Sequence, residues 1–336
     1  TLFVYNGEAW DYFSYKTYSI KRNIKACDDR LILSTQFTFD VLDTNNKVIF
    51  YYYKDIEPLD CAYDHNSKVY WIGDKKSSLI KMYSNKTFEN IVFNGPYSNF
   101  VFELKAQGDQ LWVAPGGYTS VWAKQWKTDG LFYYTDNEWH NINYLNTEAL
   151  DTISDIVTIA IDPRNNSKVY VGSYHKGILE FEDFKLKNIY SKENSSLGEL
   201  EGYGYVYVTG LDFDSKNNLW VANSGTDKKL SVKTTKDEWY SFNIGSGNIG
   251  RLLVDANDYK WILHRDGYFV VFNDNKTISN PNDDTYKIVG TTVGQGGLQA
   301  AANCMAVDSK GTVWVGTNDG LAQFYSTSKI FKQGVN

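Results

Sequence analysis

Proline and cysteine are both scarce in this sequence, with 5 prolines and 3 cysteines among 336 residues. So few cysteines exclude the disulfide framework of a small secreted domain. No apolar run approaches the roughly 18 residues that a membrane helix needs, so we expect a chain that does not span a membrane. Basic stripes are also missing and the net charge is −6, which argues against binding to nucleic acid.

Aromatic residues are plentiful, because Phe, Trp and Tyr make up 16% of the chain, with 26 tyrosines and 10 tryptophans. Asn, Asp, Ser and Gly are also abundant. Aromatic residues favour strands, and the small polar residues favour tight turns. The composition therefore predicts an all-β protein made of many short strands.

One phrase, an Asp-led turn followed by a short aromatic strand, recurs along the chain. An aspartate precedes an aromatic residue by six positions at four places: Asp64 and Tyr70, Asp214 and Trp220, Asp255 and Trp261, and Asp308 and Trp314. The stretch from Asp162 to Tyr170 is the same phrase with two residues inserted, and looser copies surround Trp112 and Ile32. Aspartate caps the turn through its own backbone, and the aromatic strand is of the kind buried between neighbouring sheets.

These seven copies predict a repeat architecture. Their anchors lie at positions 32, 70, 112, 170, 220, 261 and 314, separated by 38 residues (32 to 70) up to 58 residues (112 to 170). Such spacing is typical of four-stranded propeller blades, some with insertions. We therefore predict one seven-bladed β-propeller over residues 1–336, with four-stranded antiparallel blades and with Trp112, Trp220, Trp261 and Trp314 buried on equivalent second strands.

A second phrase, ending in Trp10, Trp139 or Trp239, is interpreted as the hairpin that leads into each outermost strand. Residues 1–14 thus resemble half a blade. They either close the ring by pairing with the last blade or remain from a preceding domain. Because the chain starts directly on this strand-like segment, we expect a processed form or an excised fragment.

The three cysteines, Cys27, Cys61 and Cys304, each occur at the end of the strand before an Asp-led turn. In a propeller that strand is the innermost one, so we expect three separate, reduced and buried thiols. The alternative, a metal site, would need ligand spacings such as CxxC or HxxxH, which do not occur. We predict no metal and no cofactor.

The loops between the second and third strands of each blade carry the candidate ligand-binding residues. The largest, APGGYTSVWAKQWKTDG, contains Tyr118, Trp122 and Trp126 beside Lys and Gln, a combination that binds sugar rings by stacking and polar contacts. The equivalent loops of other blades add Tyr174, His175, His264 and Arg265 at the same face. The alternative is that the rings fold back onto the propeller and that the other loops are ordinary solvated turns.

The segment VWVGTNDGLAQF resembles the two-component regulator propeller repeat, and four segments between residues 95 and 197 resemble, in order, a central propeller of the PorZ family of type IX secretion proteins. The resemblance implies propellers followed by a β-sandwich. It also implies a cell-surface role in attaching cargo to anionic lipopolysaccharide, with binding of that polysaccharide. No catalytic motif is carried over.

The resulting hypothesis is a non-catalytic recognition or assembly propeller of an exported protein, periplasmic or at the cell surface, with a surface polysaccharide or a partner protein as ligand. A periplasmic sensor propeller of a hybrid two-component system is the first alternative. A propeller-type polysaccharide lyase or glycosidase is the second, because propeller glycosidases place their carboxylates on different blades. No nucleophile elbow, phosphate loop or zinc signature supports an enzyme.

Overall fold

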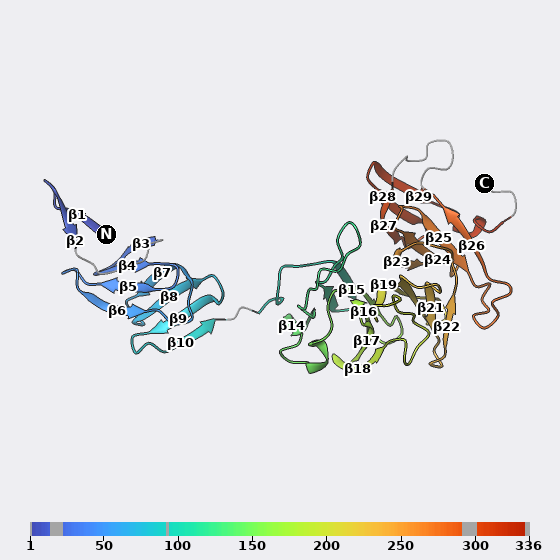
Figure 1. The fold of residues 1–336 in the computed structure, drawn as a ribbon, viewed down its shortest axis with the longest axis horizontal. Helices are drawn as coiled ribbons and strands as arrows, with labels where there is room; N and C mark the ends of the chain where they lie inside the picture. The colour runs from blue at the N-terminus through green and yellow to red at the C-terminus, as the bar shows by residue number, and fades with distance from the viewer. Residues whose placement is uncertain (1, 14–22, 92–93, 291–300, 333–336) are drawn as a thin grey trace. The chain divides into compact units, whose positions relative to one another are not determined.

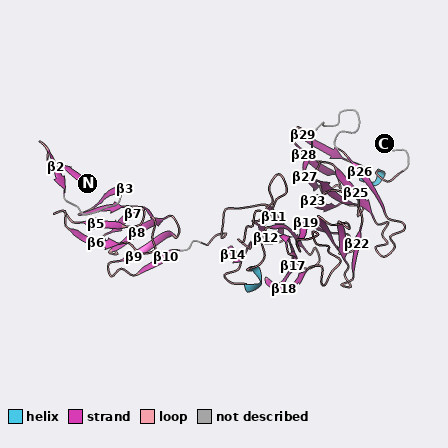
Figure 2. Ribbon diagram, in the orientation of Figure 1, coloured by secondary structure: helices cyan, strands magenta, loops and turns pink. Residues whose placement is uncertain are grey.

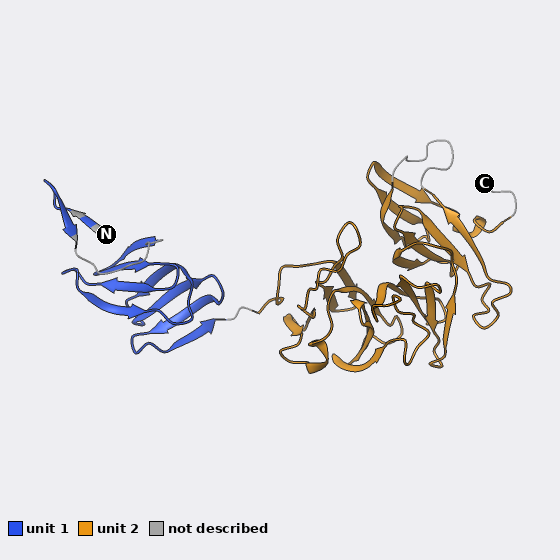
Figure 3. Cartoon of the chain, viewed as in Figure 1, with its two compact units in different colours: residues 1–93 blue, residues 94–336 orange. Residues whose placement is uncertain are grey.

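The computed structural model describes residues 2–13, 23–91, 94–290 and 301–332, which form two compact units, residues 1–93 and residues 94–336 (Figures 1 and 3). The described residues are almost entirely strands and turns (Figure 2). Their helical content is two short 3-10 helices, η1 (Glu148–Leu150) and η2 (Thr327–Lys329). The all-β prediction is therefore confirmed.

The first unit contains one hairpin and two four-stranded antiparallel sheets. Its strands are β1 (Leu2–Tyr5), β2 (Trp10–Phe13), β3 (Asn23–Cys27), β4 (Arg30–Ser34), β5 (Phe39–Leu42), β6 (Val48–Tyr52), β7 (Pro58–Asp64), β8 (Val69–Asp74), β9 (Ser78–Tyr83) and β10 (Phe88–Ile91). Strands β3–β6 and β7–β10 are simple meanders, and a core that includes Ile32, Val41 and Ile72 lies between them. Strands β1 and β2 pair with each other.

The second unit repeats the meander five times. Its strands are β11 (Glu103–Gln107), β12 (Gln110–Ala114), β13 (Leu131–Thr135), β14 (Glu138–Ile142), β15 (Ile156–Ile161), β16 (Lys168–His175), β17 (Gly177–Glu182), β18 (Lys185–Tyr190), β19 (Val206–Phe213), β20 (Leu219–Ser224), β21 (Leu230–Lys233), β22 (Trp239–Phe242), β23 (Ile249–Val254), β24 (Lys260–His264), β25 (Phe269–Asn273), β26 (Thr285–Val289), β27 (Ala302–Val307), β28 (Val313–Thr317) and β29 (Gly320–Phe324). The last meander, β27–β29, has three strands among the described residues, whereas the others have four.

The repeat assignment from the sequence is confirmed strand by strand. All seven anchors lie on the second strand of a meander, namely β4, β8, β12, β16, β20, β24 and β28. Trp139 and Trp239 lie on β14 and β22, the outermost strands, as predicted. The described residues therefore contain seven antiparallel meanders, consistent with seven propeller blades, and their closure into one seven-bladed ring over residues 1–336, with or without residues 1–14, stays a prediction.

Two half-buried carboxylates join the inner strands of the second unit. Asp212 on β19 accepts a hydrogen bond from the backbone nitrogen of Val254 on β23 at 2.8 Å. Glu103 on β11 accepts one from Ile159 on β15 at 3.0 Å. Gly210 is needed between β19 and β23, because a Cβ there would lie 2.3 Å from the backbone nitrogen of Leu252. The inner strands are thus held at fixed positions around a common space.

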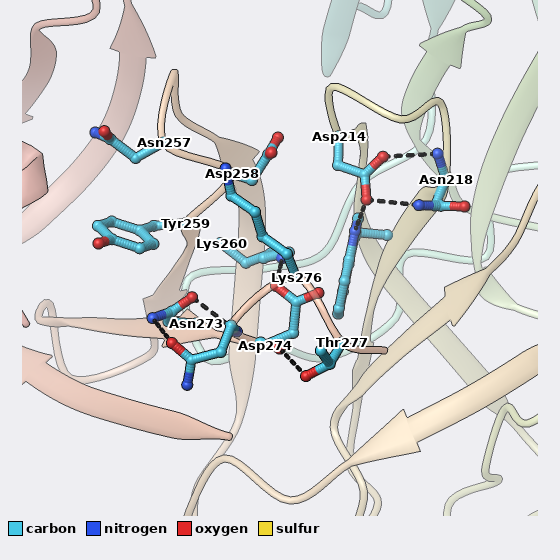
Figure 4. A network of polar contacts seen from close by, with 12 residues as sticks. Asp214, Asn218, Asn257, Asp258, Tyr259, Lys260, Asn273, Asp274, Lys276 and Thr277 are labelled. Atoms are coloured by element: carbon cyan, nitrogen blue, oxygen red, sulfur yellow. Dashed lines mark hydrogen bonds and ion pairs between the residues drawn. The ribbon is translucent and has the colours of Figure 1, made fainter. Parts of the chain in front are cut away.

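A buried lysine connects two consecutive sheets (Figure 4). The Lys260 ammonium on β24 is 2.5 Å from Asp274 Oδ1 and 3.9 Å from the centroid of the Trp220 ring on β20. Burial lowers the pKa of Lys260, while the charge of Asp274 opposes that shift. Nearby, burial and then the charges of Asp274 and Asp283 raise the pKa of Asp284 to about 6.

Two burial predictions fail at the last meander. Trp112, Trp220 and Trp261 are fully buried, but Trp314 on β28 is only half-buried. All three cysteines are free thiols, yet only Cys61 is buried, Cys27 is half-buried and Cys304 on β27 is exposed. The physical reason is the same for Trp314 and Cys304, because among the described residues of the second unit no further sheet packs beyond β27–β29.

Candidate functional site

The long loop between β12 and β13, residues 115–130, is held in place by one buried aspartate. Asp155 Oδ2 accepts hydrogen bonds from the backbone nitrogens of Gln125 at 3.1 Å and Trp126 at 2.9 Å, and Oδ1 accepts one from Lys127 at 3.1 Å. Burial raises the pKa of Asp155, although these three amides lower it. A carboxylate that receives three backbone donors fixes the course of the loop.

The backbone of this loop is unusual at both tryptophans. Trp122 and Trp126 have φ values of 63° and 58°, in the left-handed region that bulky residues rarely adopt. Gly116 lies so close to β15 that a Cβ would sit 2.2 Å from the Ile156 carbonyl oxygen. Strained backbone that is held by its surroundings is often found at ligand-binding sites. The loop is therefore a fixed structure rather than a loosely attached insertion.

The aromatic rings in and around the loop form two groups, and the rings of the first group pack inward. This inner aromatic cluster consists of Phe102, Tyr118, Trp122, Tyr174 and Tyr207. Tyr118 lies 4.9 Å from Trp122 and 5.0 Å from Tyr174 between ring centroids. Tyr174 stacks on Tyr207 at 4.0 Å and donates its hydroxyl hydrogen to the Trp122 carbonyl at 3.1 Å. Burial raises the pKa of Tyr118 to about 12, as expected for rings that fold back onto the sheets.

The second group, the outer aromatic cluster, consists of Lys124, Trp126, His175, Tyr203 and Tyr205. The Lys124 ammonium lies 3.6 Å from the Trp126 ring centroid and 4.0 Å from that of Tyr205. The His175 ring meets those of Trp126 and Tyr205 at 5.4 and 5.1 Å. Trp126 is 56% exposed and Tyr203 is 67% exposed, so this cluster presents aromatic surface to solvent.

Two basic groups of the outer cluster have lowered pKa values. Burial lowers the pKa of Lys124 to about 8. Burial, followed by the charges of Lys124 and Lys176, lowers the pKa of His175 to about 4. His175 is therefore neutral near pH 7, and its Nδ1 lies 3.1 Å from the Ser154 hydroxyl. A lysine held between two ring faces also makes cation–π contacts that stiffen the cluster.

The two remaining predicted residues, His264 and Arg265, belong to neither cluster. His264 is buried at the end of β24, where it stacks on Tyr268 at 4.1 Å and its Nε2 is 3.1 Å from the Ser246 carbonyl. Arg265 is exposed, and its charge lowers the pKa of Tyr174, which burial raises. The structure thus gives His264 a packing role and places the Arg265 charge near the inner aromatic cluster.

Several residues of the two clusters escaped the sequence analysis. Tyr203, Tyr205 and Tyr207 alternate in the sequence, and their rings stack in that order at centroid distances of 5.8 and 6.0 Å. That alternation was a usable signal. Strand β19 pairs with the end of β16 through Tyr207 opposite Tyr174, which brings these tyrosines to the loop. Asp155 gave no signal, because its partners lie about thirty residues earlier in the chain.

Within residues 2–13, 23–91, 94–290 and 301–332, no group of three or more His, Cys, Asp or Glu is placed to hold a metal ion. In the same part of the chain, no helix has the length and apolar character needed to cross a membrane.

Comparison with known proteins supports the fold. The two-component regulator propeller family matches residues 296–319. PorZ, an essential surface component of the type IX secretion system of Porphyromonas gingivalis, is similar in structure with a TM-score of 0.76 and 22% identity. The match covers 94% of this chain and 44% of PorZ, so the chain spans less than half the length of that protein. At this identity the likeness shows a shared propeller fold.

Other structural matches are weaker. The extracellular domain of the hybrid two-component system BT3049 from Bacteroides thetaiotaomicron has a TM-score of 0.47 and 16% identity, over 97% of this chain and 47% of that one. A virginiamycin B lyase from Staphylococcus aureus also reaches 0.47, with 10% identity over 91% of this chain and 94% of that one. A search of the curated proteins finds no match.

Proposed function

We propose that this chain is a non-catalytic recognition propeller that binds a surface glycan through the outer aromatic cluster. The observation that carries the proposal is that Trp126 is 56% exposed while Asp155 fixes its backbone through a hydrogen bond. Sugar rings stack on exposed aromatic faces, and a preformed face binds at a lower entropic cost than a mobile one. The proposed contact surface is formed by Trp126, Tyr203 and Tyr205.

The inner aromatic cluster has a supporting role in this proposal. Tyr118 and Trp122 pack against Tyr174 and against β23, where a Cβ at Gly250 would lie 2.9 Å from the Trp122 ring. These rings hold the loop rather than face a ligand. The proposed binding surface is therefore narrower than the loop as a whole, and Lys124 supplies positive charge directly beneath it.

The cellular setting of the proposal is an exported protein, periplasmic or at the cell surface, in a secretion or attachment complex of the type IX kind. The structural likeness to PorZ supports this setting, because PorZ is a surface component of that system. A partner protein of such a complex is the other ligand considered, since exposed Trp and Tyr are also enriched at protein interfaces.

The test is a titration of purified anionic surface polysaccharide into wild type and two single variants. Trp126→Ala removes the exposed ring of the cluster, and Trp10→Ala is the matched control, because Trp10 is 69% exposed on β2. Loss of one stacking ring should weaken binding by about 0.5–1.5 kcal/mol, which is roughly a factor of 2 to 10. Trp10→Ala should bind like wild type.

Two outcomes would contradict the proposal. Unchanged affinity in a folded Trp126→Ala variant would remove the outer aromatic cluster from the site. Absence of binding by wild type would favour a partner protein as the ligand. Melting temperatures of all variants show whether each one is folded.

A sensor propeller is the second candidate function, favoured by the two-component regulator propeller match over residues 296–319. The two functions differ in what the gene encodes after the propeller. A membrane helix and a kinase domain would support the sensor, whereas a β-sandwich would support the secretion role. Sequencing of the complete gene separates them.

A further inference from the structure

The inner strands of the second unit surround a cavity that the proposed glycan surface does not use. Its volume is about 410 Å³. Strands β11, β15, β19, β23 and β27 all contribute lining residues. The charged residues among them are Glu103, Lys105, Asp212 and Arg251. These four charged side chains line one cavity, and the pairing between them is unequal.

Two of these four charges satisfy each other. Glu103 Oε1 accepts hydrogen bonds from the Thr158 hydroxyl at 3.2 Å and from the Ile159 backbone nitrogen at 3.0 Å. Glu103 Oε2 lies 3.9 Å from Arg251 Nη1. Arg251 Nη2 donates to the carbonyl of Phe102 at 3.3 Å. Glu103 and Arg251 thus form a linked pair across the inner strands.

The other two charges have no such pairing. Asp212 accepts backbone hydrogen bonds from Phe213 at 3.0 Å and Val254 at 2.8 Å, but no cationic group in the described residues lies within ion-pair distance of it. Lys105 makes no direct hydrogen bond or ion pair within that same part of the chain. Burial raises the pKa of Asp212 and the charge of Lys105 lowers it, so the two groups interact electrostatically. Among the described residues, Asp212 and Lys105 therefore line one cavity without an ion-pair partner within 4.0 Å.

The inner aromatic cluster lies beside the Arg251 part of this cavity. The Arg251 guanidinium is 5.9 Å from the Phe102 ring centroid, and Phe102 meets Tyr118 edge-on at 5.0 Å. Trp122 packs against Gly250, the residue before Arg251. Aromatic side chains therefore border the Arg251 end of the cavity.

We propose that this cavity binds a small zwitterion, with its ammonium group at Asp212 and its carboxylate at Lys105, as in a free amino acid or a short peptide. A simple cation would be repelled by Lys105 and Arg251, and a simple anion would be repelled by Asp212 and Glu103. A zwitterion gives each unpaired charge an opposite partner without leaving a new charge unpaired. Charge-assisted hydrogen bonds of this kind are the strong ones.

The first experiment compares three probes by isothermal titration calorimetry. Glycylglycine carries both charges, N-acetylglycine carries only the carboxylate, and glycinamide carries only the ammonium group. Because a hydrogen bond to a charged group contributes about 1.5–3 kcal/mol, glycylglycine should bind about tenfold or more tightly than either of the other probes. Equal binding of all three probes, or no binding of glycylglycine at millimolar concentration, would overturn the proposal.

The second experiment assigns the two ends of the ligand. Lys105→Met should reduce glycylglycine affinity to about that of glycinamide, and Asp212→Asn should reduce it to about that of N-acetylglycine. Glu182→Gln is the matched control, because Glu182 lies on β17, does not line the cavity and forms an ion pair with Lys168 at 3.8 Å. Wild-type affinity in a folded Lys105→Met variant would overturn the assignment, even if Asp212→Asn failed to fold.

This site is independent of the glycan surface. Lys105→Met should leave polysaccharide binding unchanged, and Trp126→Ala should leave glycylglycine binding unchanged. Failure of one proposal is therefore distinguishable from failure of the other.

Discussion

The indole nitrogen of Trp220 donates a hydrogen bond to Asp214 Oδ2 at 3.0 Å, which explains why these residues are six positions apart. The other carboxylate oxygen, Oδ1, accepts hydrogen bonds from the backbone nitrogens of Lys216 and Asn218 at 3.0 and 2.8 Å. One aspartate therefore closes the turn and also fixes the tryptophan of the following strand. Asp255 with Trp261 and Asp308 with Trp314 repeat the indole contact at 3.1 and 3.0 Å.

The first prediction follows from this double role. Asp214→Ala leaves several donors in a buried turn without an acceptor, so it should lower the free energy of unfolding by about 1–3 kcal/mol. Equilibrium denaturation in urea measures the change. Asp308→Ala is the comparison, because its turn and Trp314 are more exposed and its loss should be smaller. An equal or larger loss at Asp308 would contradict the argument from burial.

The sequence predicted the repeat because each blade contains its own local signal. The Asp-led turn and the aromatic strand lie within about ten residues of each other, so they could be recognised without knowledge of the neighbours. Burial was less predictable, because it depends on what packs against a blade. Trp314 and Cys304 have the same local sequence context as their buried counterparts, but β27–β29 is the last sheet of its unit.

The position of the long loop between β12 and β13 was predicted correctly, but its division into two clusters was not, and ligand binding by this loop stays a prediction. Trp122 folds inward and Trp126 outward, although they are only four residues apart and have similar φ values. The difference arises from contacts distant in the sequence: Tyr174 and Gly250 hold Trp122, while Tyr205 packs against Trp126. Such contacts connect different blades and leave no pattern in the loop itself.

The second prediction concerns the close approach of the loop to β15. Gly116→Ala would place a Cβ 2.2 Å from the Ile156 carbonyl oxygen and 2.3 Å from its nitrogen, both backbone atoms that cannot move independently. The substitution should destabilise the protein by about 1–3 kcal/mol, as overpacking does. Thermal unfolding measures the loss.

The control for this substitution is Gly73→Ala on β8, where the nearest atom to the added Cβ is the Asp60 carbonyl oxygen at 3.7 Å. That is an ordinary van der Waals distance, so stability should change little. A Gly116→Ala variant as stable as Gly73→Ala would show that the loop can move away from β15.

The third prediction concerns the Lys260–Asp274 pair. Asp274→Ala leaves a fully buried ammonium next to the Trp220 ring without its carboxylate, so it should cost about 3–5 kcal/mol. The double variant Lys260→Met, Asp274→Asn removes both charges and keeps similar volumes. It should be more stable than Asp274→Ala alone. Guanidinium denaturation of the set tests this order, and a double variant less stable than Asp274→Ala would contradict it.

The last prediction is a pH dependence at His175. Its pKa is lowered to about 4 in the folded protein, mainly by burial, whereas an unfolded histidine titrates near pH 6.5. The unfolded chain therefore binds the proton first as the pH falls, so the His175 contribution is complete above about pH 6.5 and is lost progressively down to about pH 4. Because the ring is only partly buried, we expect a loss of about 1 kcal/mol across this range rather than the full value of the shift.

Urea unfolding of wild type and of His175→Gln at pH 7 and pH 5 measures the effect. Wild type should lose more stability than the variant between these two values, and parallel losses would show that His175 does not titrate in this window.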